Sequence, residues 1–494
     1  MSKVLILNPP SPDNSYINRD LMGGMGVHNA RGISIKAKLI FKIKSTTVHI
    51  PMMQLVNAAT VLKKESHELL VIDAVNTNKN LKYVLDKAKQ FSPEYILIAT
   101  SSSCFKYERD VVAQQLKQLL PAVKIIAVGD MITEMPNELL PYFDVAIMGE
   151  VEQSIHLICA NKPYDEIPSI IWQEKEKNEQ KVIIKKSSAG KEFIPAVQLD
   201  KMPLPQWDLF PIHAYSYYPM LTKTPVALIQ ASRGCPYGCG YCPYPANQGK
   251  QWRARSAESV FEEIKWDVEQ FGFKAVFFRD PLFTADQKRI DKLCDLIINS
   301  KIKIQFVFET RPELLTMSGL IEKLAKAGCR TINFGVEDIH PDILKKINRL
   351  PLPLDKIMET VHKCEKNGIR TSCFFILGLP GSTKQSMKET IEFSKKLLSS
   401  QTEYKIATPF PGTLLYTMAK ENNWIKHEGF DSLGGYSASM LASTDFDQDY
   451  LEKLAEKSLT DFYFSPKYLT RYVKRGDFIT TGYVFVKQKI RQKK

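Results

Sequence analysis

The first 160 residues alternate between short apolar runs and segments with helical spacing. Apolar runs that end in polar or glycine residues are typical of buried parallel strands, whereas apolar residues at i, i+3, i+4 and i+7 are typical of amphipathic helices. Strands are predicted at Lys3–Leu7, Leu69–Ile72, Tyr95–Ala99, Lys124–Val128 and Val145–Met148, and helices at 51–66, Leu81–Gln90 and Asp110–Leu120. This α/β alternation predicts a doubly wound, Rossmann-like sheet that binds ligands at the carboxyl ends of its strands.

A second alternating series begins at Ala227. Its strands are predicted at Ala227–Gln230, Ala275–Phe278, Lys303–Phe308, Thr331–Phe334, Thr371–Leu377 and Tyr404–Ala407. Six strand–helix units predict a partial (β/α)6 barrel of the TIM type, with its site again at the carboxyl ends of the strands. We therefore predict a Rossmann-like domain over 1–160, a connector with a small hairpin over 161–225, the barrel over 226–425 and a small mixed region over 426–494.

Composition places the chain among ordinary globular proteins of the cytoplasm. It has 494 residues, 44% of them hydrophobic, and nine cysteines. We expect neither a disulfide scaffold nor a secretory leader, and no apolar run approaches the roughly 20 residues that span a bilayer. The net charge of +13 fits a nucleic-acid partner, an anionic membrane surface or solvated lysines. The basic tail follows the apolar stretch 483–486, a pattern that indicates either peripheral membrane contact or a solvated terminus.

The most informative motif is a cluster of three cysteines. Residues 233–245 read RGCPYGCGYCPYP, which places Cys235, Cys239 and Cys242 in a C-x3-C-x2-C array. A [4Fe–4S] cluster normally takes four thiolates, so three would leave one iron open to a substrate or cofactor. The alternative is a structural zinc site, which usually has four ligands. The other barrel cysteines are expected to be buried apolar residues, namely Cys294, Cys329, Cys364 and Cys373.

Polar and glycine residues follow the later strands of the barrel series. Asp280, Glu309, Arg311 and Glu337 each stand at a predicted strand end, and Gly378 and Gly381 follow another. Their positions suit a shared binding site. The charged residues could instead form ion pairs at the barrel mouth, and the glycines a plain turn.

Taken together, these motifs resemble the radical S-adenosylmethionine superfamily, and within it the subgroup with an N-terminal cobalamin-binding domain. The similarity covers roughly residues 1–420. In the barrel it is carried by the cysteine loop, 252–256, 278–280, 334–337, 375–381 and 406–413. In the rest of the chain it is carried by 8–10, 72–74, 128–129, 149–152 and 199–205.

The resemblance implies a binding site for S-adenosylmethionine over the three cysteines. In the family, the open iron chelates the amino and carboxylate groups of the cofactor, and an electron from the cluster releases a 5′-deoxyadenosyl radical that abstracts a substrate hydrogen. The resemblance places Tyr241 near the adenine, Asp280 at the methionine ammonium and Glu337 at the ribose. Arg311 would meet a carboxylate, and the remaining implied contacts are Glu309, Gly378, Gly381 and Thr408.

The resemblance also implies a cobalamin site in the first domain. The residues expected there are Asn8, Pro9, Asp73, Ser101, Ser102, Ser103, Gly129, Gly149 and Glu150. The Asp-x-His-x-x-Gly motif that often supplies a lower cobalt ligand does not occur, and Met131 stands where related sequences often carry histidine. We therefore expect base-off cobalamin without a protein histidine, and surface or core positions for His67 and His156. The alternative is an empty Rossmann-like domain.

The implied activity is methylation of an unactivated carbon, or a radical cyclisation or rearrangement, of a small molecule or of a lipid or isoprenoid. In the methylation version methylcobalamin supplies the methyl group, and ferredoxin or flavodoxin would supply electrons. One alternative is transfer-RNA modification, but such enzymes carry extra cluster cysteines in the first domain, where this chain has only Cys104 and Cys159. A nucleic-acid partner is therefore not expected. The other alternative is a non-catalytic iron–sulfur or cobalamin sensor.

Overall fold

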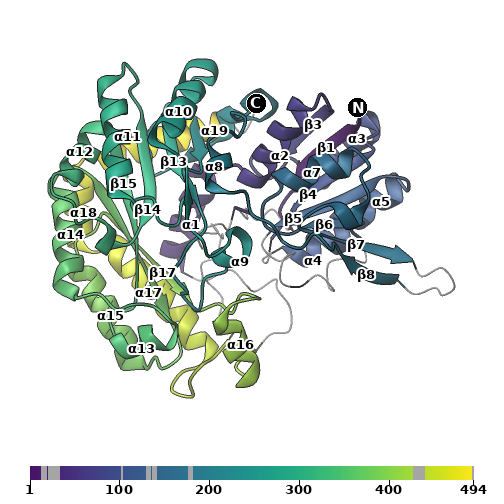
Figure 1. Ribbon diagram of the computed structural model, residues 1–494. Coiled ribbons are helices and arrows are strands. Elements are labelled where there is room, and N and C mark those ends of the chain that lie inside the picture. The colour runs from purple at the N-terminus through teal and green to yellow at the C-terminus, as the bar shows by residue number, and fades with distance from the viewer. Residues whose placement is uncertain are drawn as a thin grey trace.

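Two α/β domains lie side by side in the computed structural model (Figure 1). The structure describes residues 1–12, 19–20, 34–101, 104–129, 135, 142–175, 182–426 and 440–491. The N-terminal domain is drawn in purple and blue, and the barrel domain in teal and green. The last helices, in yellow, lie against the barrel domain.

The N-terminal sheet has seven strands in the order β3-β1-β4-β5-β6-β7-β8. They are β1 Lys3–Asn8, β3 Glu68–Asp73, β4 Tyr95–Thr100, β5 Lys124–Gly129, β6 Val145–Ile147, β7 Ile170–Lys175 and β8 Val182–Lys186. The first five are parallel, as predicted. The prediction that the strand at 145–148 is the last one is wrong, because β7 and β8 continue the sheet in antiparallel fashion. The hairpin expected in the connector is thus part of this sheet.

Helices cover both faces of the N-terminal sheet. They are α2 Met53–Lys64, α3 Leu81–Phe91, α4 Phe105–Tyr107, α5 Gln114–Leu119 and α7 Glu152–Cys159. The predicted apolar face of the first is confirmed, since Leu55, Ala58, Ala59 and Leu62 are all buried. A π-helical segment, Glu108–Ala113, joins α4 to α5, so this helical stretch begins before the predicted residue 110.

The second domain is an open barrel of six parallel strands in the order β10-β13-β14-β15-β16-β17. They are β10 Val226–Ile229, β13 Ala275–Phe278, β14 Gln305–Thr310, β15 Cys329–Glu337, β16 Arg370–Leu377 and β17 Gln401–Ile406. Every predicted strand is present, which confirms the partial barrel. Its helices are α9 Tyr244–Gln248, α10 Ala257–Phe271, α11 Gln287–Asn299, α12 Leu320–Ala327, α13 Pro341–Lys346, α14 Leu354–Lys366, α15 Lys384–Lys396 and α16 Leu414–Glu421. The cysteine loop lies between the short paired strands β11 Ser232–Arg233 and β12 Arg253–Ala254.

Elements from both ends of the chain pack beside β17. They are α1 Ile35–Thr47, α17 Gln448–Tyr463, α18 Pro466–Lys474 and α19 Asp477–Arg491. The phenol of Tyr463 donates to the carbonyl of Thr402 in β17 at 3.2 Å. The sequence predicted neither α1 nor three helices at the C-terminus.

The connector joins the two domains through a buried aromatic group. Trp207 is fully buried and packs against Phe210, Tyr215 and Phe273. Its indole N–H donates to Asp267 of α10 at 2.9 Å. The connector also contains α8 Ala196–Leu199 and β9 Ser216–Tyr217, and β9 pairs with β2 Val48–His49 of the first domain. One continuous apolar core therefore runs from the first sheet into the barrel.

Candidate active site

The cysteine loop is held by backbone contacts at each of its turns. The Cys235 N–H donates to the carbonyl of Gly249 at 3.1 Å, and the Cys242 N–H to that of Cys239 at 3.0 Å. Gly240 bonds both neighbouring segments, since its N–H donates to Ile347 at 2.6 Å and its carbonyl accepts from Leu415 at 2.8 Å. The loop is thereby fixed over the carboxyl ends of the barrel strands.

Each of the three sulfurs has a hydrogen-bond donor. The backbone N–H groups of Tyr237 and Tyr244 stabilise the thiolates of Cys235 and Cys242. The Cys239 sulfur is approached by two guanidinium groups, from Arg349 at 3.7 Å and from Arg311 at 4.0 Å. Donors and positive charge around sulfur are what an anionic iron–sulfur cluster requires. The residues present therefore fit such a cluster, with the three cysteines as its ligands.

The geometry of the thiols bears on the zinc alternative. In the described part of the chain, no three His, Cys, Asp or Glu side chains are arranged to hold one metal ion. A zinc site draws its ligands to about 2 Å from a single ion, whereas a cluster spreads three cysteines over three irons. Burial raises the pKa of Cys235 to about 11, so iron would have to displace a proton on binding.

Tyr241 and Glu337 meet beside the cysteine loop. The tyrosine phenol donates to Glu337 Oε1 at 2.8 Å, and burial raises the pKa of that phenol well above its usual value. Arg349 joins the pair, with its guanidinium 3.7 Å from Glu337 Oε1 and 3.4 Å from the Tyr241 oxygen. Glu337 has a φ of +70°, which turns its side chain back toward Gly335. These three side chains and Cys239 form one polar group at the mouth.

Arg349 is the site residue that the sequence reasoning missed. It follows α13 outside any strand end, and its side chain is buried. The preceding Asn348 has a φ of +52°, a conformation that asparagine tolerates better than most residues and that turns the chain toward the mouth. An arginine directly after an asparagine turn that follows a helix was the feature of the sequence that could have indicated Arg349 as a site residue. Arg311, which was predicted, stacks over the Tyr237 ring with its guanidinium 4.2 Å from the ring centre.

Asp280 supports the start of the cysteine loop. One carboxylate oxygen accepts from the N–H of Ala231 at 2.7 Å, and the other from the Ser232 hydroxyl at 3.0 Å. The side chain is fully buried, and burial raises its pKa to about 6. These contacts show that Asp280 positions the start of the cysteine loop, and its contact with the methionine ammonium stays a prediction.

Glu309 belongs to a buried charge group that links the domains. The Arg279 guanidinium lies 2.9 Å from Glu309 and 2.8 Å from Asp20. Both residues of the arginine–glutamate pair are buried, and burial raises the pKa of Glu309 to about 7. Pairing with Arg279 does not return the pKa of Glu309 to its usual range. One guanidinium is shared between two carboxylates, and Asp280 adds a third negative charge nearby.

We expect Glu309→Gln to change how stability depends on pH. The folded protein holds a proton on Glu309 up to about pH 7, whereas an unfolded chain loses it near pH 4.5. The free energy of unfolding should therefore fall as pH rises through this window, and the glutamine variant should lack that fall. At pH 7.5 the variant should be more stable by up to roughly 3 kcal/mol, with little difference at pH 4.5. Thermal melting at both pH values measures this, and parallel pH profiles would contradict it.

The predicted glycine and threonine contacts lie around the same mouth. Gly378 and Gly381 have positive φ values of +79° and +90°, and a Cβ there would meet Leu451 and Lys346 respectively. The Thr408 hydroxyl donates to the carbonyl of Ile406 at 3.0 Å. Lys346 immediately precedes Ile347, which binds the cysteine loop, so the glycine turn and the loop meet at the end of α13. Contact of these residues with S-adenosylmethionine stays a prediction.

The carboxyl edge of the N-terminal sheet is polar. Asn8 donates to Asp73 at 2.9 Å, and Asp73 also accepts from Tyr215 of the connector at 2.9 Å. Burial raises the pKa of Asp73. Gly129 ends β5, and a Cβ there would overlap the carbonyl oxygen of Thr100. Small and polar residues along this edge fit a large cofactor that approaches the backbone.

Arg19 crosses that same edge and connects it to the barrel. Its guanidinium donates to the carbonyls of Pro9 at 2.7 Å and Pro10 at 3.0 Å, and pairs with Glu108. Glu108 in turn accepts from the N–H of Ser101 at 2.7 Å. The next residue, Asp20, binds Arg279 at the end of β13. Two adjacent buried residues thus tie the carboxyl ends of both sheets together.

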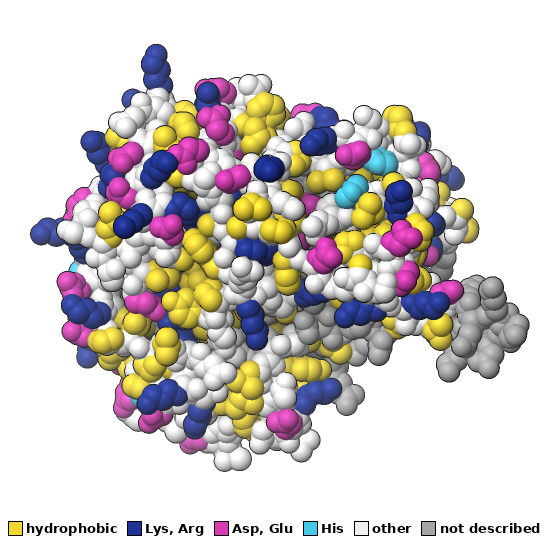
Figure 2. Space-filling view, in the orientation of Figure 1, with side chains coloured by type: hydrophobic (Ala, Val, Ile, Leu, Met, Phe, Trp, Pro, Cys, Tyr) yellow, Lys and Arg dark blue, Asp and Glu magenta, His cyan; other side chains and the backbone are white. Residues whose placement is uncertain are grey.

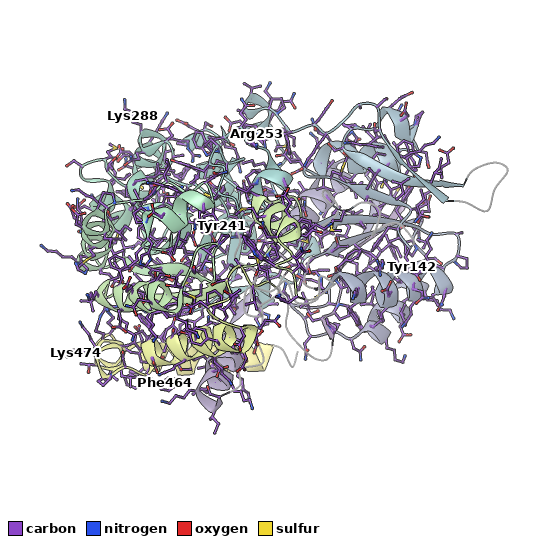
Figure 3. The ribbon with its side chains drawn as sticks, turned by 90° about the horizontal axis from the view of Figure 1, so that it is seen from below. Tyr142, Tyr241, Arg253, Lys288, Phe464 and Lys474 are labelled. Atoms are coloured by element: carbon purple, nitrogen blue, oxygen red, sulfur yellow. The ribbon has the colours of Figure 1, made fainter. Side chains whose placement is uncertain are left out.

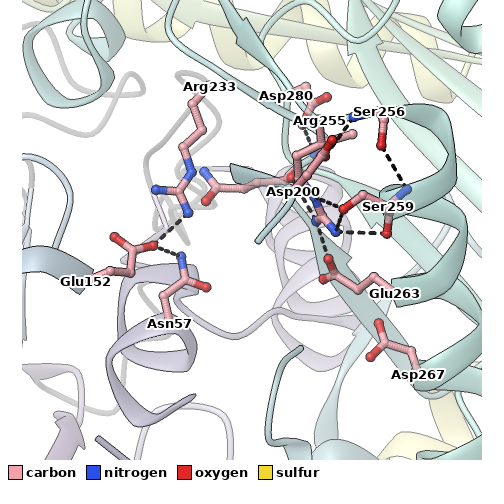
Figure 4. A network of polar contacts seen from close by, with 12 residues as sticks. Asn57, Glu152, Asp200, Arg233, Arg255, Ser256, Ser259, Glu263, Asp267 and Asp280 are labelled. Carbon is pink, nitrogen blue, oxygen red and sulfur yellow. Dashed lines mark hydrogen bonds and ion pairs between the residues drawn. The ribbon is translucent and has the colours of Figure 1, made fainter. Parts of the chain in front are cut away.

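Glu150 forms a second buried link between the domains. Arg253 binds both of its carboxylate oxygens, at 2.8 and 3.2 Å, and the N–H of Ile194 donates to it at 2.6 Å. Arg233 lies 3.4 Å from Glu150 and pairs with Glu152 at 2.7 Å, as Figure 4 shows for the second contact. Glu150 was predicted to line the cobalamin site, but its contacts favour a role in domain docking. Its neighbour Gly149, with a φ of +78°, lies against the backbone of Asn247.

The predicted histidines of the first domain lie away from the carboxyl edge. His67 precedes β3 and accepts from the N–H of Ser2 at 3.2 Å, and His156 contacts the backbone of its own helix. Ser102, Ser103 and Met131 lie outside the described residues. The six other cysteines are buried, as expected for the four in the barrel.

Gly234 shapes the start of the cysteine loop. Its φ is +79°, and a Cβ there would overlap the carbonyl oxygen of Gln251, whereas a Cβ at Gly238 meets open space. We expect Gly234→Ala to cost about 1–3 kcal/mol or more of local strain and to lower the iron content after reconstitution several-fold. Gly238→Ala is the matched control and should keep its iron. Equal iron content in the two variants would refute this role for Gly234.

The chain is similar to several known proteins. The radical SAM superfamily matches residues 229–394. An uncharacterized methyltransferase of Pyrococcus horikoshii is 28% identical over 436 residues, which cover 85% of this chain and 89% of that protein. The fold resembles that of OxsB, a cobalamin-dependent S-adenosylmethionine radical enzyme, with a TM-score of 0.67 and 14% identity over 100% of this chain and 72% of the other. It also resembles TsrM, a radical S-adenosylmethionine methyltransferase from Kitasatospora setae, with a TM-score of 0.63 and 18% identity over 85% and 75% of the two chains.

The family match begins at the last residue of β10 and includes the cysteine loop, Asp280, Glu309, Arg311, Glu337 and both glycines of the turn. Together with the three sulfurs, their donors and the open six-stranded barrel, this match identifies residues 229–394 as a radical SAM domain.

Proposed function

We propose that this protein is a cobalamin-dependent radical S-adenosylmethionine enzyme that methylates an unactivated carbon of its substrate. One observation carries the proposal: buried ion pairs join the carboxyl ends of the two sheets. Arg19 and Asp20 make one of these connections, and Glu150 with Arg253 makes the other. Figure 3 shows Tyr241 and Arg253 between the two domains. Two cofactors bound at these edges would share one substrate.

Different residues of the barrel would bind the cluster and the parts of S-adenosylmethionine. Cys235, Cys239 and Cys242 would hold the cluster, which supplies the electron that cleaves S-adenosylmethionine. Arg311 and Arg349 place positive charge beside Cys239, which stabilises bound anionic groups. The Tyr241–Glu337 pair offers a phenol and a carboxylate to the adenosyl part of the cofactor. Burial of this group excludes water, which protects a reactive radical.

The first domain would hold the second cofactor. Asn8, Ser101 and Gly129 lie at the edge to which cobalamin would bind, and cobalamin supplies the methyl group that is transferred. We propose binding without a histidine ligand from the protein. Methylation is favoured over cyclisation because two of the three similar proteins described above are named methyltransferases.

Location and partners follow from the same chemistry. No disulfide joins any of the nine cysteines, which supports a reducing, cytoplasmic setting. We propose that a ferredoxin or flavodoxin delivers the electron, and that the protein contacts the membrane surface to reach a lipid or isoprenoid substrate. Transfer-RNA modification finds no support, since Cys104 and Cys159 are separately buried at α4 and α7.

Isotope transfer tests the proposal. Protein reconstituted with iron, sulfide and cobalamin would be freed of unbound cofactor and incubated with dithionite, S-adenosylmethionine carrying a trideuterated methyl group and an extract of a strain lacking the gene. We expect cobalt to stay with the protein and a labelled product to form. Loss of cobalt, or an extract in which only unlabelled products or labelled nucleosides appear, would overturn cobalamin-dependent methylation.

A further inference from the structure

An apolar cavity of about 240 Å³ lies beside β17, at the open side of the barrel. It is enclosed by inward-facing residues of β16 and β17 and by α1, α17, α18 and α19. Most of its wall is aromatic or aliphatic, including Leu39, Ile43, Phe374, Tyr463, Tyr468 and Leu469. A cavity of this size and lining suits an apolar ligand.

The inner end of the cavity approaches the cysteine loop. Gln401, Glu403 and Lys405 line it from alternate positions of β17, so they share one face of the strand. The next position on that face is Ala407, which belongs to the apolar cluster against which Tyr241 packs. Two residues of a strand span about 7 Å. A chain that fills the cavity therefore ends one side-chain layer below the mouth that holds Tyr241 and Arg349.

The charged groups in the cavity wall lie beside groups of opposite charge. Lys44 pairs with Glu403, and Arg370 pairs with Asp477. Burial lowers the pKa of Lys405 to about 7, and the nearby Glu403 opposes this shift. An uncharged ligand segment can thus occupy the cavity without leaving a buried ion exposed to it.

The outer end of the cavity opens onto an exposed apolar surface, which we call the helical face. Its large apolar side chains repeat at helical spacing on α1, α18 and α19: Ile35, Leu39, Leu469, Val473, Phe478, Ile479, Tyr483 and Val486. Leu39 and Leu469 belong both to this surface and to the cavity wall, and they are 51% and 41% exposed. In Figure 3, the purple helix α1 lies against the yellow C-terminal helices, near Phe464. Contiguous apolar surface of this kind marks an interaction site.

The charged residues of the helical face indicate what kind of surface it contacts. Its helices α1 and α18 contain seven Lys or Arg residues and no acidic residue. Two of the seven, Lys44 and Arg471, pair with Glu403 and Glu365, and Asp477 of α19 pairs with Arg370. Lys36, Lys38, Lys42, Lys467 and Lys474 are exposed. On the face seen in Figure 2, by contrast, basic and acidic side chains are interspersed. None of the described helices is long and apolar enough to cross a bilayer. Apolar stripes flanked by lysines suit the surface of an anionic membrane.

We propose that the helical face seats on an anionic bilayer and that the adjoining cavity takes one apolar chain of a membrane lipid. The basic residues contact the lipid head groups, and the chain passes between Leu39 and Leu469 toward the mouth at Tyr241. This inference names the substrate class of the proposed function and rests on it for the reaction that follows.

Vesicle binding tests the docking. The reconstituted full-length protein should sediment with vesicles of phosphatidylcholine and phosphatidylglycerol in equal parts at least about tenfold more strongly than with phosphatidylcholine alone. Ile479→Glu combined with Val473→Glu should lower binding to the mixed vesicles by about tenfold or more. Val197→Glu, at a residue 74% exposed on α8, is the matched control and should bind as the parent does. Equal binding by all three proteins would overturn the docking face.

A fluorescent chain tests the cavity. We expect cis-parinaric acid, added without vesicles, to gain fluorescence with the parent and with the Val473→Glu, Ile479→Glu variant, but several-fold less with Ile43→Trp, which fills the cavity. Unchanged binding by Ile43→Trp would overturn the cavity assignment, provided that its melting curve matches the parent. Cleavage of S-adenosylmethionine, measured without lipid, distinguishes failure of the proposed function from failure of the lipid site alone. Its loss would contradict the proposed function, whereas its retention with no vesicle or chain binding would contradict only the lipid site.

Discussion

Replacing Cys239 with alanine should abolish both the iron–sulfur absorbance and the reductive cleavage of S-adenosylmethionine. Two thiolates cannot hold a cluster that already lacks one of its four usual cysteine ligands. Cys239 is also the sulfur that Arg349 and Arg311 approach, at 3.7 and 4.0 Å. Its loss therefore removes a ligand and also the sulfur that these two guanidinium groups approach. We expect iron content and 5′-deoxyadenosine formation to fall below detection, a loss larger than the 10–100-fold typical of changes around a metal ligand.

Cys294→Ala provides the matched control for that experiment. Cys294 is a buried thiol of α11, outside the cysteine loop. It acts as a small apolar residue, so its replacement should leave the cluster spectrum and cleavage intact. Full cluster absorbance in Cys239→Ala, or equal losses in both variants, would contradict the assignment of the cluster to the loop.

Replacing Arg253 with methionine should separate the two domains. The guanidinium binds both oxygens of Glu150 and the carbonyls of Ile194 and Gln248, at 2.5 and 2.6 Å. Arg253 and Glu150 are buried, so removal of the arginine leaves a carboxylate whose nearest positive charge is Arg233 at 3.4 Å, with the N–H of Ile194 as its remaining close donor. Removing one partner of a buried pair costs about 3–5 kcal/mol. We expect a lower melting temperature and faster proteolysis of the connector.

Removing the charge of Glu150 as well shows whether Arg253 stabilises the protein by charge pairing or by side-chain packing. Glu150→Met in the Arg253→Met background should recover a large part of the lost stability, because no unpaired charge then stays buried. Lys292→Met breaks the exposed pair with Glu258 and should have no measurable effect. A double variant that is less stable than Arg253→Met alone would show that the pair does not act through charge.

The sequence predicted the strands well and their long-range partners poorly. All six barrel strands and five of the N-terminal strands are visible as apolar runs, because burial of both faces leaves a local signal. The hairpin β7–β8 looked like part of a connector, since its pairing with β6 depends on residues far along the chain. The helix α1 was missed because lysines interrupt its apolar positions, which face both the cavity and the surface.

The same limit applies to the site. The cysteines, Glu337 and Arg311 reach one mouth because parallel strands end at one edge of a sheet. Asp280 and Glu150 also reach the expected edges. Their carboxylates accept hydrogen bonds from buried protein donors there. Sequence position identifies which edge an acid occupies, and only the fold determines whether a backbone N–H, an arginine or a ligand meets it there.

The central claim is that the three cysteines and the mouth around them cleave S-adenosylmethionine by electron transfer. The most direct measurement is chromatographic detection of 5′-deoxyadenosine after anaerobic incubation of the reconstituted protein with dithionite and S-adenosylmethionine. We predict its release by the parent and by Cys294→Ala, and none by Cys239→Ala. Absence of 5′-deoxyadenosine from parent protein that shows the full cluster spectrum would contradict the claim.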